Sequence, residues 1–431
     1  MHEMKDSGVA WIGQIPKNWL IERLQWHVDE VKESNKPIKT TRILSLTNKT
    51  GVIPYEDKGE QGNKAKENYE EYNIAYPNTI VANSMNILIG SVGICDYFGC
   101  VSPIYYVYKP KKNENLHFIN YIFQMQQFQK ELRRYANGIL EIRLRLSSSN
   151  ILKRHIAFPP LQEQQIISNY LDKKCSLVDT LIYKQNQQIE KLKWYKQSLI
   201  TEVITKGLNS NAMMKDSGVE WIGEISNDLT VIPLKFLLSE PMMYGANESG
   251  QKEKIDNCLR YIRITDIDSE GKLKDSEDNQ YLSYEIGNPY ILEEGDILFA
   301  RSGGTVGKTF LFHTNYGQSA FAGYLIKAKC NIKKIIPNYL LYFTQSSLYE
   351  VWKNMIFIQA TIQNIGANKY SNMEIVLPSI MEQKQIVKYL DAKCEKIDKL
   401  IDLKQRKIEK LQDYKKSLIY EYVTGKKEVT A

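Results

Sequence analysis

The sequence predicts a mixed α/β (α+β) protein made of two related halves, each a globular domain followed by a long helix. Two internal repeats carry this prediction. The stretch Glu163–Thr205 returns as Glu382–Thr424 at a constant offset of 219, with 22 of 43 positions identical. The decapeptide MKDSGVAWIG at 4–13 returns as MKDSGVEWIG at 214–223, at an offset of 210. Repetition on this scale indicates a duplicated architecture.

Length and composition suit two domains of ordinary size with real cores. The 431 residues are 43% hydrophobic and 25% charged. The net charge of +7 is consistent with a nucleic-acid partner but does not establish one. Six cysteines stand without CxxC or Cys/His clusters, so we expect neither a zinc site nor a disulfide framework. The opening MHEMKDSGVAWIG is too charged for a signal peptide, and no apolar run reaches membrane length, so we expect a cytoplasmic protein.

We divide the chain into four segments. They are a globular domain at 1–158, a long helix with its linker at 159–212, a second globular domain at 213–376 and a second long helix at 377–431. The repeated decapeptide lies at the start of each globular domain. The helix offset exceeds the decapeptide offset by nine residues, so the second globular region is slightly longer.

The two globular regions differ in sequence but share one order of elements. Each has apolar runs around a Gly-containing turn, NTIVANSMNILIGSVGICDYFG in the first and GDILFARSGGTVGKTFLF in the second. Each then has a strand candidate and one helical stretch, FINYIFQMQQFQKELRRYA and PNYLLYFTQSSLYEVWKNM. The spacing of the strand signals predicts a mostly antiparallel or mixed sheet with flanking helices.

Both copies of the longer repeat predict one long helix with a heptad seam. No Gly or Pro stands between Leu161 and Lys206, and apolar residues recur at steps of three and four. Such a seam needs a partner helix, and the other copy is the simplest partner. Polar residues interrupt the seam at the same two places in both copies, Gln185/Lys404 and Lys196/Lys415, where they can fix register at a cost in stability. The apolar seam positions are Cys175, Val178, Ile182, Ile189, Leu192, Leu199 and Val203, then Cys394, Ile397, Ile401, Ile408, Leu411, Leu418 and Tyr422.

Several patterns, each weak alone, together resemble the specificity subunit of type I restriction–modification systems. They are MKDSGVEWIGEI, RITDI, GDILFARSGGTVGK, YANGI with RLRLSSSNI, and the helix entries PPLQEQ and PSIMEQKQI. The resemblance covers essentially the whole chain, twice over. The first half departs from it where ANSMNILIG stands instead of ARSGGTVGK, so contact residues do not transfer directly between the halves.

The resemblance implies two target-recognition domains, each reading one half of a split double-stranded DNA target. It also implies that the two long helices pair antiparallel as a coiled coil, space the domains and dock two modification subunits, through which restriction subunits join. It further implies that the chain has no catalytic residues, cofactor or metal of its own. S-adenosylmethionine belongs to the modification partner, an adenine methyltransferase, and ATP and Mg to the restriction partner.

Three motifs that suggest catalysis are incomplete. SGGTVGKT at 302–309 lacks the first Gly of a phosphate-binding loop, and TFLFHT after it predicts a strand instead of a helix. Asn288–Pro289–Tyr290 lacks the second proline of an amino-methyltransferase motif, and Glu56–Asp57–Lys58, which contains a nuclease-like E-x-K tripeptide, has no PD motif upstream. We interpret the first two as turns and the third as a solvated loop.

The residues that contact DNA are chosen by side-chain type and position. Phosphates attract Lys and Arg, whereas base edges are read by Arg, Asn, Gln, Ser and Thr. The alternative for each of them is a structural or solvated role. The candidates are Ser45, Asn48, Lys49, Asn83, Asn86, Arg143 and Arg145 in the first domain, and Tyr244, Asn247, Arg263, Thr265, Arg301, Ser302 and Lys308 in the second.

Two other classes of protein stay open at this point. One is an enzyme fused to a recognition module, which a methyl-transfer assay on the isolated chain would reveal. The other is a coiled-coil scaffold with two protein-binding domains and no DNA specificity, which a salt-dependent DNA titration would distinguish.

Overall fold

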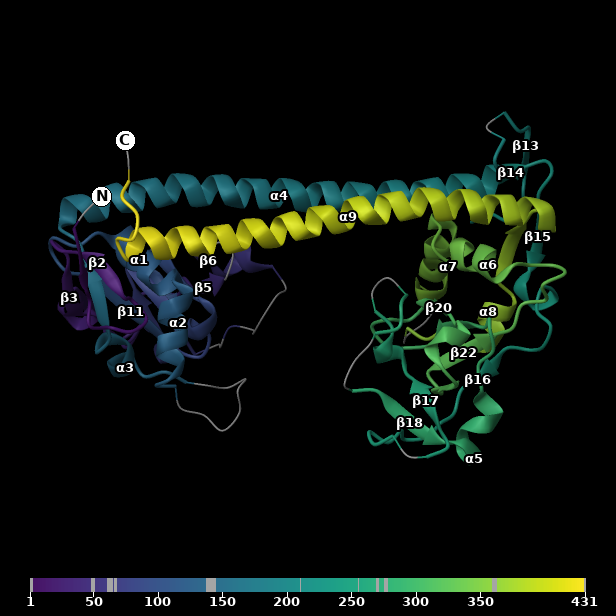
Figure 1. Cartoon of the computed structure of the whole chain (residues 1–431), viewed down its shortest axis with the longest axis horizontal. Coiled ribbons are helices and arrows are strands. Elements are labelled where there is room, and N and C mark those ends of the chain that lie inside the picture. The colour runs from purple at the N-terminus through teal and green to yellow at the C-terminus, as the bar shows by residue number, and fades with distance from the viewer. Residues whose placement is uncertain are drawn as a thin grey trace. The chain divides into compact units, whose positions relative to one another are not determined.

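The computed structural model describes two compact units, shown in Figure 1. Unit 1 comprises Met1–Asn186 and Gln405–Ala431, and unit 2 comprises Gln187–Lys404. Each unit therefore holds one globular domain and a part of each of the two long helices; we call the globular parts domain 1 and domain 2. The structure describes residues 3–47, 51–59, 65, 68–136, 145–209, 211–254, 256–268, 271–274, 278–358 and 363–429.

Domain 1 is built on a four-stranded antiparallel sheet in the order β4-β11-β8-β9. Smaller antiparallel pairs join β1 to β2, β3 to β12, β5 to β6 and β7 to β10. Its strands are β1 Met4–Asp6, β2 Gln14–Pro16, β3 Leu20–Arg23, β4 Val28–Glu30, β5 Leu44–Thr47, β6 Gly51–Pro54, β7 Asn73–Ala75, β8 Thr79–Asn83, β9 Val92–Cys95, β10 Gly99–Val101, β11 Tyr105–Pro110 and β12 His155–Phe158. Its helices are α1 Leu116–Gln124, α2 Gln126–Arg133 and α3 Ser148–Leu152.

Domain 2 repeats this plan with the four-stranded antiparallel sheet β16-β22-β19-β20 and adds the mixed sheet β18-β17-β21, in which β17 and β21 are parallel. β13 pairs with β14, and β15 with β23. Its strands are β13 Met214–Asp216, β14 Glu224–Ser226, β15 Thr230–Pro233, β16 Met243–Tyr244, β17 Cys258–Ile262, β18 Gln280–Ser283, β19 Ile297–Ala300, β20 Thr309–Leu311, β21 Ser319–Phe321, β22 Leu325–Ala328 and β23 Glu374–Leu377. Its helices are α5 Tyr284–Gly287, α6 Pro337–Phe343, α7 Ser347–Ile358 and α8 Ala367–Ser371. The predicted antiparallel or mixed sheet is confirmed in both domains.

Each predicted helical stretch is two helices in the structure, not one. In domain 1 the break falls at Met125, whose backbone is extended (φ −66°, ψ 123°) and whose side chain is buried. The bend lets α1 and α2 both face the core, where the Phe123 and Phe128 rings meet edge to face at 5.9 Å. A straight helix would turn part of this apolar surface to solvent, and burying it stabilises the bend.

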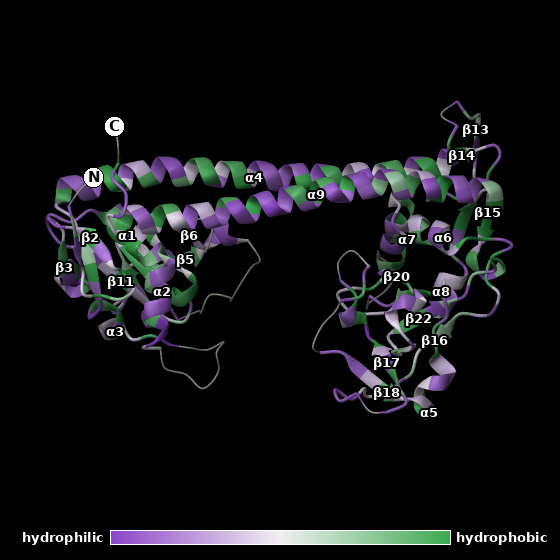
Figure 2. Cartoon of the chain, viewed as in Figure 1, coloured by the Kyte–Doolittle hydropathy of each residue, from purple (hydrophilic) through white to green (hydrophobic). Residues whose placement is uncertain are grey.

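The two long helices are continuous as predicted: α4 spans Leu161–Lys206 and α9 spans Ile380–Val423. Gly207 ends α4 in a left-handed conformation (φ +72°), and its N–H donates to the Val203 carbonyl. A residue with a side chain would be strained at this left-handed φ, and its Cβ would lie 2.6 Å from Glu382 Oε1, so the glutamate would have to move. Along both helices hydrophilic and hydrophobic residues alternate in short steps (Figure 2).

Within each unit α4 and α9 pair antiparallel. In unit 1, Tyr170 contacts Tyr422, with ring centroids 4.6 Å apart, and Asp179 binds Lys415 at 2.7 Å, so rising numbers in α4 meet falling numbers in α9. In unit 2, Lys404 donates to Gln188, and Lys196 binds Asp398 at 2.7 Å, with the same reversal. The antiparallel pairing that the resemblance implies is therefore confirmed in each unit, and the apolar seam residues are buried or half-buried.

The two polar seam lysines form equivalent ion pairs. Lys415 pairs with Asp179 in unit 1, and its repeat counterpart Lys196 pairs with Asp398, the counterpart of Asp179, in unit 2. The same pair thus occurs once in each unit. In unit 1 the lysine is on α9 and the aspartate on α4, and in unit 2 the lysine is on α4 and the aspartate on α9. Because each lysine is only about a quarter exposed, a shifted register would leave a partly buried charge unpaired, which costs stability.

Each domain is fixed to the start of its own long helix by the same contacts. The buried Gln164 of α4 accepts the Asn115 N–H at the start of α1, and the buried Gln383 of α9 accepts the Ile336 N–H at the start of α6. The hydroxyls of Tyr121 and Tyr342 donate to Asp172 and Asp391, at 2.7 and 2.6 Å respectively. These contacts make each domain and its helix one packed body.

The main core of each domain extends onto the end of the other long helix. Leu418, Ile419 and Val423 of α9 are buried in the core of domain 1. Ile200 and Ile204 of α4 are buried in the core of domain 2. Across the described residues, no helix combines the length and the apolar character needed to cross a membrane.

Candidate nucleic-acid interface

The central strands β8 and β19 each have one end beside the long helices and one end away from them. In domain 2, Gly295 just before β19 lies against Pro337, which opens α6 on the α9 side. In domain 1, β11 runs from Tyr105, paired with Asn83 at the end of β8, toward α1 and its contact with Gln164. The opposite ends, at Asn83 and Ala300, therefore lie away from the helices; we call them the far ends.

The far end of β19 gathers three of the predicted residues. Arg301 lies over the Tyr244 ring, 5.2 Å from its centroid, and its Nε–H donates to Asn364 Oδ1 at 3.3 Å. The Tyr244 hydroxyl in turn accepts the Ala367 N–H at 3.0 Å. Ser302 forms a β-bridge with Asn364. These contacts hold the guanidinium in place at a partly exposed position, an arrangement suited to binding a ligand edge.

The turn from β19 to β20 is not a phosphate-binding loop. β20 follows it as a strand from Thr309, as predicted, so no helix N-terminus faces the glycines. Gly303 and Gly307 adopt left-handed conformations (φ +81° and +83°), which a turn of this shape requires. The hydrogen bond from Gly307 N–H to the Ala300 carbonyl closes the turn.

Three other predicted residues of domain 2 have partners inside the protein. Arg263 donates to both carboxylate oxygens of Asp266, at 3.1 and 2.7 Å, and this bonding raises the pKa of its guanidinium. Thr265 lies 3.5 Å from the same carboxylate, and Lys308 donates to the Asp268 carbonyl. Because the guanidinium donors of Arg263 are engaged by both oxygens of this carboxylate, Arg263 suits a structural role better than base reading. Asn247, by contrast, is exposed.

The predicted residues of domain 1 are divided between buried and exposed positions. Ser45, opposite Ile53 in β5-β6, and Asn83, whose Oδ1 accepts the Met85 N–H, are buried. Asn86 and Arg145 are exposed. The predicted Asn48, Lys49 and Arg143 lie outside the described residues. All of these assignments to DNA contact stay predictions.

Two residues at the far end of β19 were not predicted from the sequence. Tyr324 is 61% exposed, and its carbonyl accepts the Arg301 N–H. Asn364 holds the Arg301 side chain. The offset of 219 places Asn364 opposite the predicted Arg145, and this relation is the signal in the sequence that could have revealed it.

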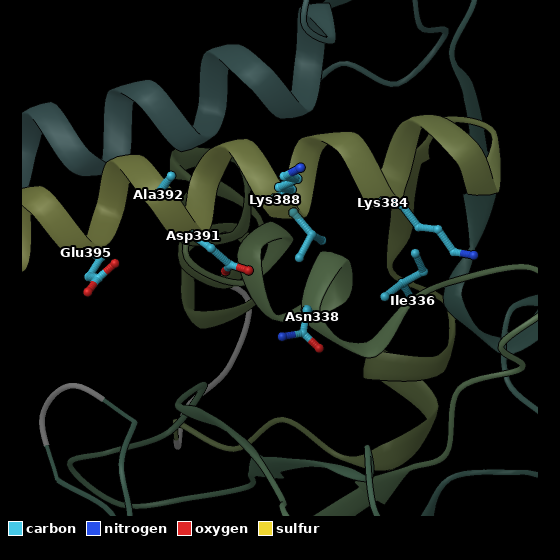
Figure 3. Close-up of a pocket in the computed structure, with 8 residues that line it drawn as sticks. Ile336, Asn338, Lys384, Lys388, Asp391, Ala392 and Glu395 are labelled. Atoms are coloured by element: carbon cyan, nitrogen blue, oxygen red, sulfur yellow. The ribbon is translucent and has the colours of Figure 1, made fainter.

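A hollow lies along α9 in unit 2, away from the far end of β19. It has a volume of about 500 Å³, and Figure 3 shows Ile336 and Asn338 of domain 2 below α9, toward which Asp391 and Lys384 extend. Lys384, Lys388, Asp391 and Glu395 line its α9 side. The lining mixes both signs of charge, which suits contact with a protein surface more than with a phosphate backbone. Among the described residues no three or more His, Cys, Asp and Glu side chains converge as a metal site would require.

Two repeated α/β domains mounted on paired helices define a modular protein with internal duplication, and sequence comparison places it in a family. The family model described as "Type I restriction modification DNA specificity domain" matches twice, at residues 26–191 and 248–413. The chain therefore belongs to this family and carries two copies of its domain.

Individual relatives agree with this assignment. The chain is 20% identical over 287 residues to the type I restriction enzyme StySPI specificity subunit of Salmonella potsdam, covering 66% of this chain and 59% of the relative. It is 26% identical over 252 residues to the MjaVIII specificity subunit of Methanocaldococcus jannaschii, covering 54% of each. The chain thus spans little more than half the length of the curated relatives it matches.

A solved structure has the same fold. It comes from work on complex assembly and conformational transition of a type I restriction–modification system, and its matching chain has a TM-score of 0.71 at 12% identity. The match covers 95% of this chain and 98% of that chain. At this identity the likeness supports the fold alone.

Proposed function

We propose that the chain is the DNA sequence-recognition subunit of a type I restriction–modification complex. The observation that carries the proposal is the duplication of the family domain on two copies of one fold. Their far ends carry different side chains, so the two copies suit two unlike half-sites of one bipartite target. Residues 1–158 and 213–376 would each read one half-site in double-stranded DNA, in the cytoplasm.

The helical segments 159–212 and 377–431 would set the gap between the half-sites and dock the partners. Two modification subunits fit this surface because it is duplicated. Leu181 and its counterpart Leu400 are 44% and 47% exposed, and Tyr195 and its counterpart Tyr414 are 58% and 51% exposed. Each unit thus presents one such leucine and one such tyrosine, and exposed apolar residues repeated in this way support two copies of one partner.

In this proposal the chain binds no cofactor and catalyses nothing. The modification subunits would bring S-adenosylmethionine, and restriction subunits, joined through them, ATP and Mg. No observation favours a protein-binding scaffold without DNA specificity.

The test is to select bound sequences from a pool of random DNA duplexes, using the chain co-purified with its modification subunits. Two conserved half-sites at a fixed gap are expected, together with binding that weakens as salt rises. Enrichment of no sequence would contradict the proposal. Methyl transfer or cleavage by the purified chain without partners would contradict its non-catalytic role.

Docking has its own test. Changing Leu181 to Asp should remove one modification subunit and leave the other, and changing Leu400 to Asp should do the same at the second site. Lys333→Ala, an exposed change in domain 2 outside the long helices, is a comparison that spares this surface. Unchanged stoichiometry in the double variant, measured by mass photometry, would show that partners bind elsewhere.

A further inference from the structure

The backbone around Arg301 is fixed by three hydrogen bonds at the far end of β19. The Ala300 N–H donates to the Lys308 carbonyl, and the Arg301 N–H donates to the Tyr324 carbonyl. The Ile365 N–H then donates to the Arg301 carbonyl, which ties the segment before α8 to the strand end. Arg301 is thus held from both sides.

Domain 1 has the same three hydrogen bonds at the far end of β8. The Asn83 N–H donates to the Ser91 carbonyl, the Ser84 N–H to the Ile104 carbonyl, and the Leu146 N–H to the Ser84 carbonyl. The backbone position of Arg301 is therefore taken by Ser84 in domain 1. A sequence alignment that matches ANS at 82–84 with ARS at 300–302 would instead place Asn83 opposite Arg301. That alignment is wrong by one residue, because the hydrogen bonds place Ser84 opposite Arg301.

The segment whose N–H donates to the strand end carries the arginine in domain 1 and an asparagine in domain 2. Just before Ile365 stands Asn364, and just before its counterpart Leu146 stands Arg145. Domain 2 thus has an arginine on the strand end and an asparagine facing it, whereas domain 1 has a serine on the strand end and an arginine facing it. Ser84 is buried and Arg145 is exposed, so in domain 1 the long polar side chain available at this place is Arg145.

We infer that each domain reads a G·C base pair with an arginine from this one place, Arg301 in domain 2 and Arg145 in domain 1. The inference rests on the proposed DNA recognition and adds the residue, the base and the positioning groups. Asn364 and Tyr244 are positioning residues for Arg301. Asn364 accepts the Nε–H of Arg301, and the Tyr244 ring lies under the guanidinium carbon. The edge of the Arg301 guanidinium that carries its two terminal nitrogens is then left to donate to guanine O6 and N7. This is the pairing that arginine makes with guanine in the major groove.

The test is to map modified bases in the genome of cells that express the chain with its modification subunits. Arg301→Ala should relax selection at a single G·C position of one half-site by roughly ten- to a hundred-fold, and Arg145→Ala should do so in the other half-site. Arg301→Lys should also relax it, because an ammonium has no planar fork. Lys333→Ala and Arg23→Ala each remove an exposed charge from the same two domains and should change neither half-site.

Positioning is tested at Asn364. Asn364→Ala should relax the same position as Arg301→Ala but less, and should have no further effect once Arg301 is absent. Asn364→Asp should retain selection, because a carboxylate still accepts the Nε–H. A merely structural role would lower modification at all sites alike and would add to the effect of Arg301→Ala.

The outcomes separate this inference from the proposed function. If the unaltered chain directs modification to no bipartite sequence, the proposed function fails. A bipartite sequence whose base preferences survive both arginine changes, or that relaxes in the same half with either, would overturn this inference alone.

Discussion

The buried glutamine at the start of each long helix allows a sharp test of how the domains are mounted. Gln383 accepts the Ile336 N–H at 2.9 Å and donates to the carbonyls of Lys334 and Pro378, both at 3.0 Å. Gln383→Leu keeps the shape but leaves one N–H and two carbonyls without these bonds. A buried polar group left unpaired costs about 1–3 kcal/mol, and water can reach some of them, so we expect a total loss of about 2–4 kcal/mol.

Hydrogen exchange measures this loss locally, because the two units need not unfold together. The amides of α6 should exchange about 30- to 1,000-fold faster in Gln383→Leu, if they open through release of the domain from α9. Gln164→Leu should have a matching effect on α1, because Gln164 accepts the Asn115 N–H and donates to the Pro159 carbonyl in the same way, although its other acceptor is the Glu114 carboxylate. Exposed Lys384→Ala is the control. An α6 rate within about threefold of the unaltered chain would refute the mounting role.

Three further predictions follow from the helices and the buried charges. A double-mutant cycle on Lys196 and Asp398, with Met and Asn as replacements, should give a coupling of about 0.5–1 kcal/mol in urea unfolding, smaller in high salt, because the pair is partly exposed; zero coupling would show that it does not hold register. Burial raises the pKa of the Asp296 carboxyl above 3.8 in the folded protein, so folding favours its protonated form. The folding stability that this form contributes at low pH is lost as pH rises through the folded pKa. Asp296→Asn should therefore raise the unfolding temperature of unit 2 more at pH 7 than at pH 3.5, and the opposite order would contradict this sign. One heptad added to the middle of α4 and of α9 lengthens each helix by about 10 Å, so the gap between the half-sites should grow by up to about three base pairs. An active variant that keeps the original gap would show that the helices do not set the distance between the half-sites.

The long helices could be predicted because their signal is local and repeated. Apolar residues at steps of three and four, in stretches without Gly or Pro, predicted both helices and their seam. The polar position that the two copies share, Lys196/Lys415, predicted where the register would be fixed. The partner of Lys415 could not be predicted, because Asp179 stands outside the seam and pairs only once the direction of α9 is known. Likewise, a helical pattern at 118–136 does not show that packing breaks the helix at Met125.

The candidate site was predictable in part. Residue type and turn position picked out Arg301, Tyr244 and Ser302, which the structure brings together around Asn364. The same reasoning chose Arg263, whose partner Asp266 is three residues away and occupies its guanidinium. The correspondence of Ser84 with Arg301 depends on backbone hydrogen bonds between segments far apart in the sequence. Similarity of short peptides cannot supply it.

The most direct measurement is to sequence modified bases in the genome of otherwise identical cells with and without this chain, both carrying the modification subunits. We predict methylated adenines in one bipartite sequence, with two unlike halves at a fixed gap, only when the chain is present. Methylation that is unchanged without the chain, or that follows one continuous sequence, would contradict the claim that its two domains read two half-sites.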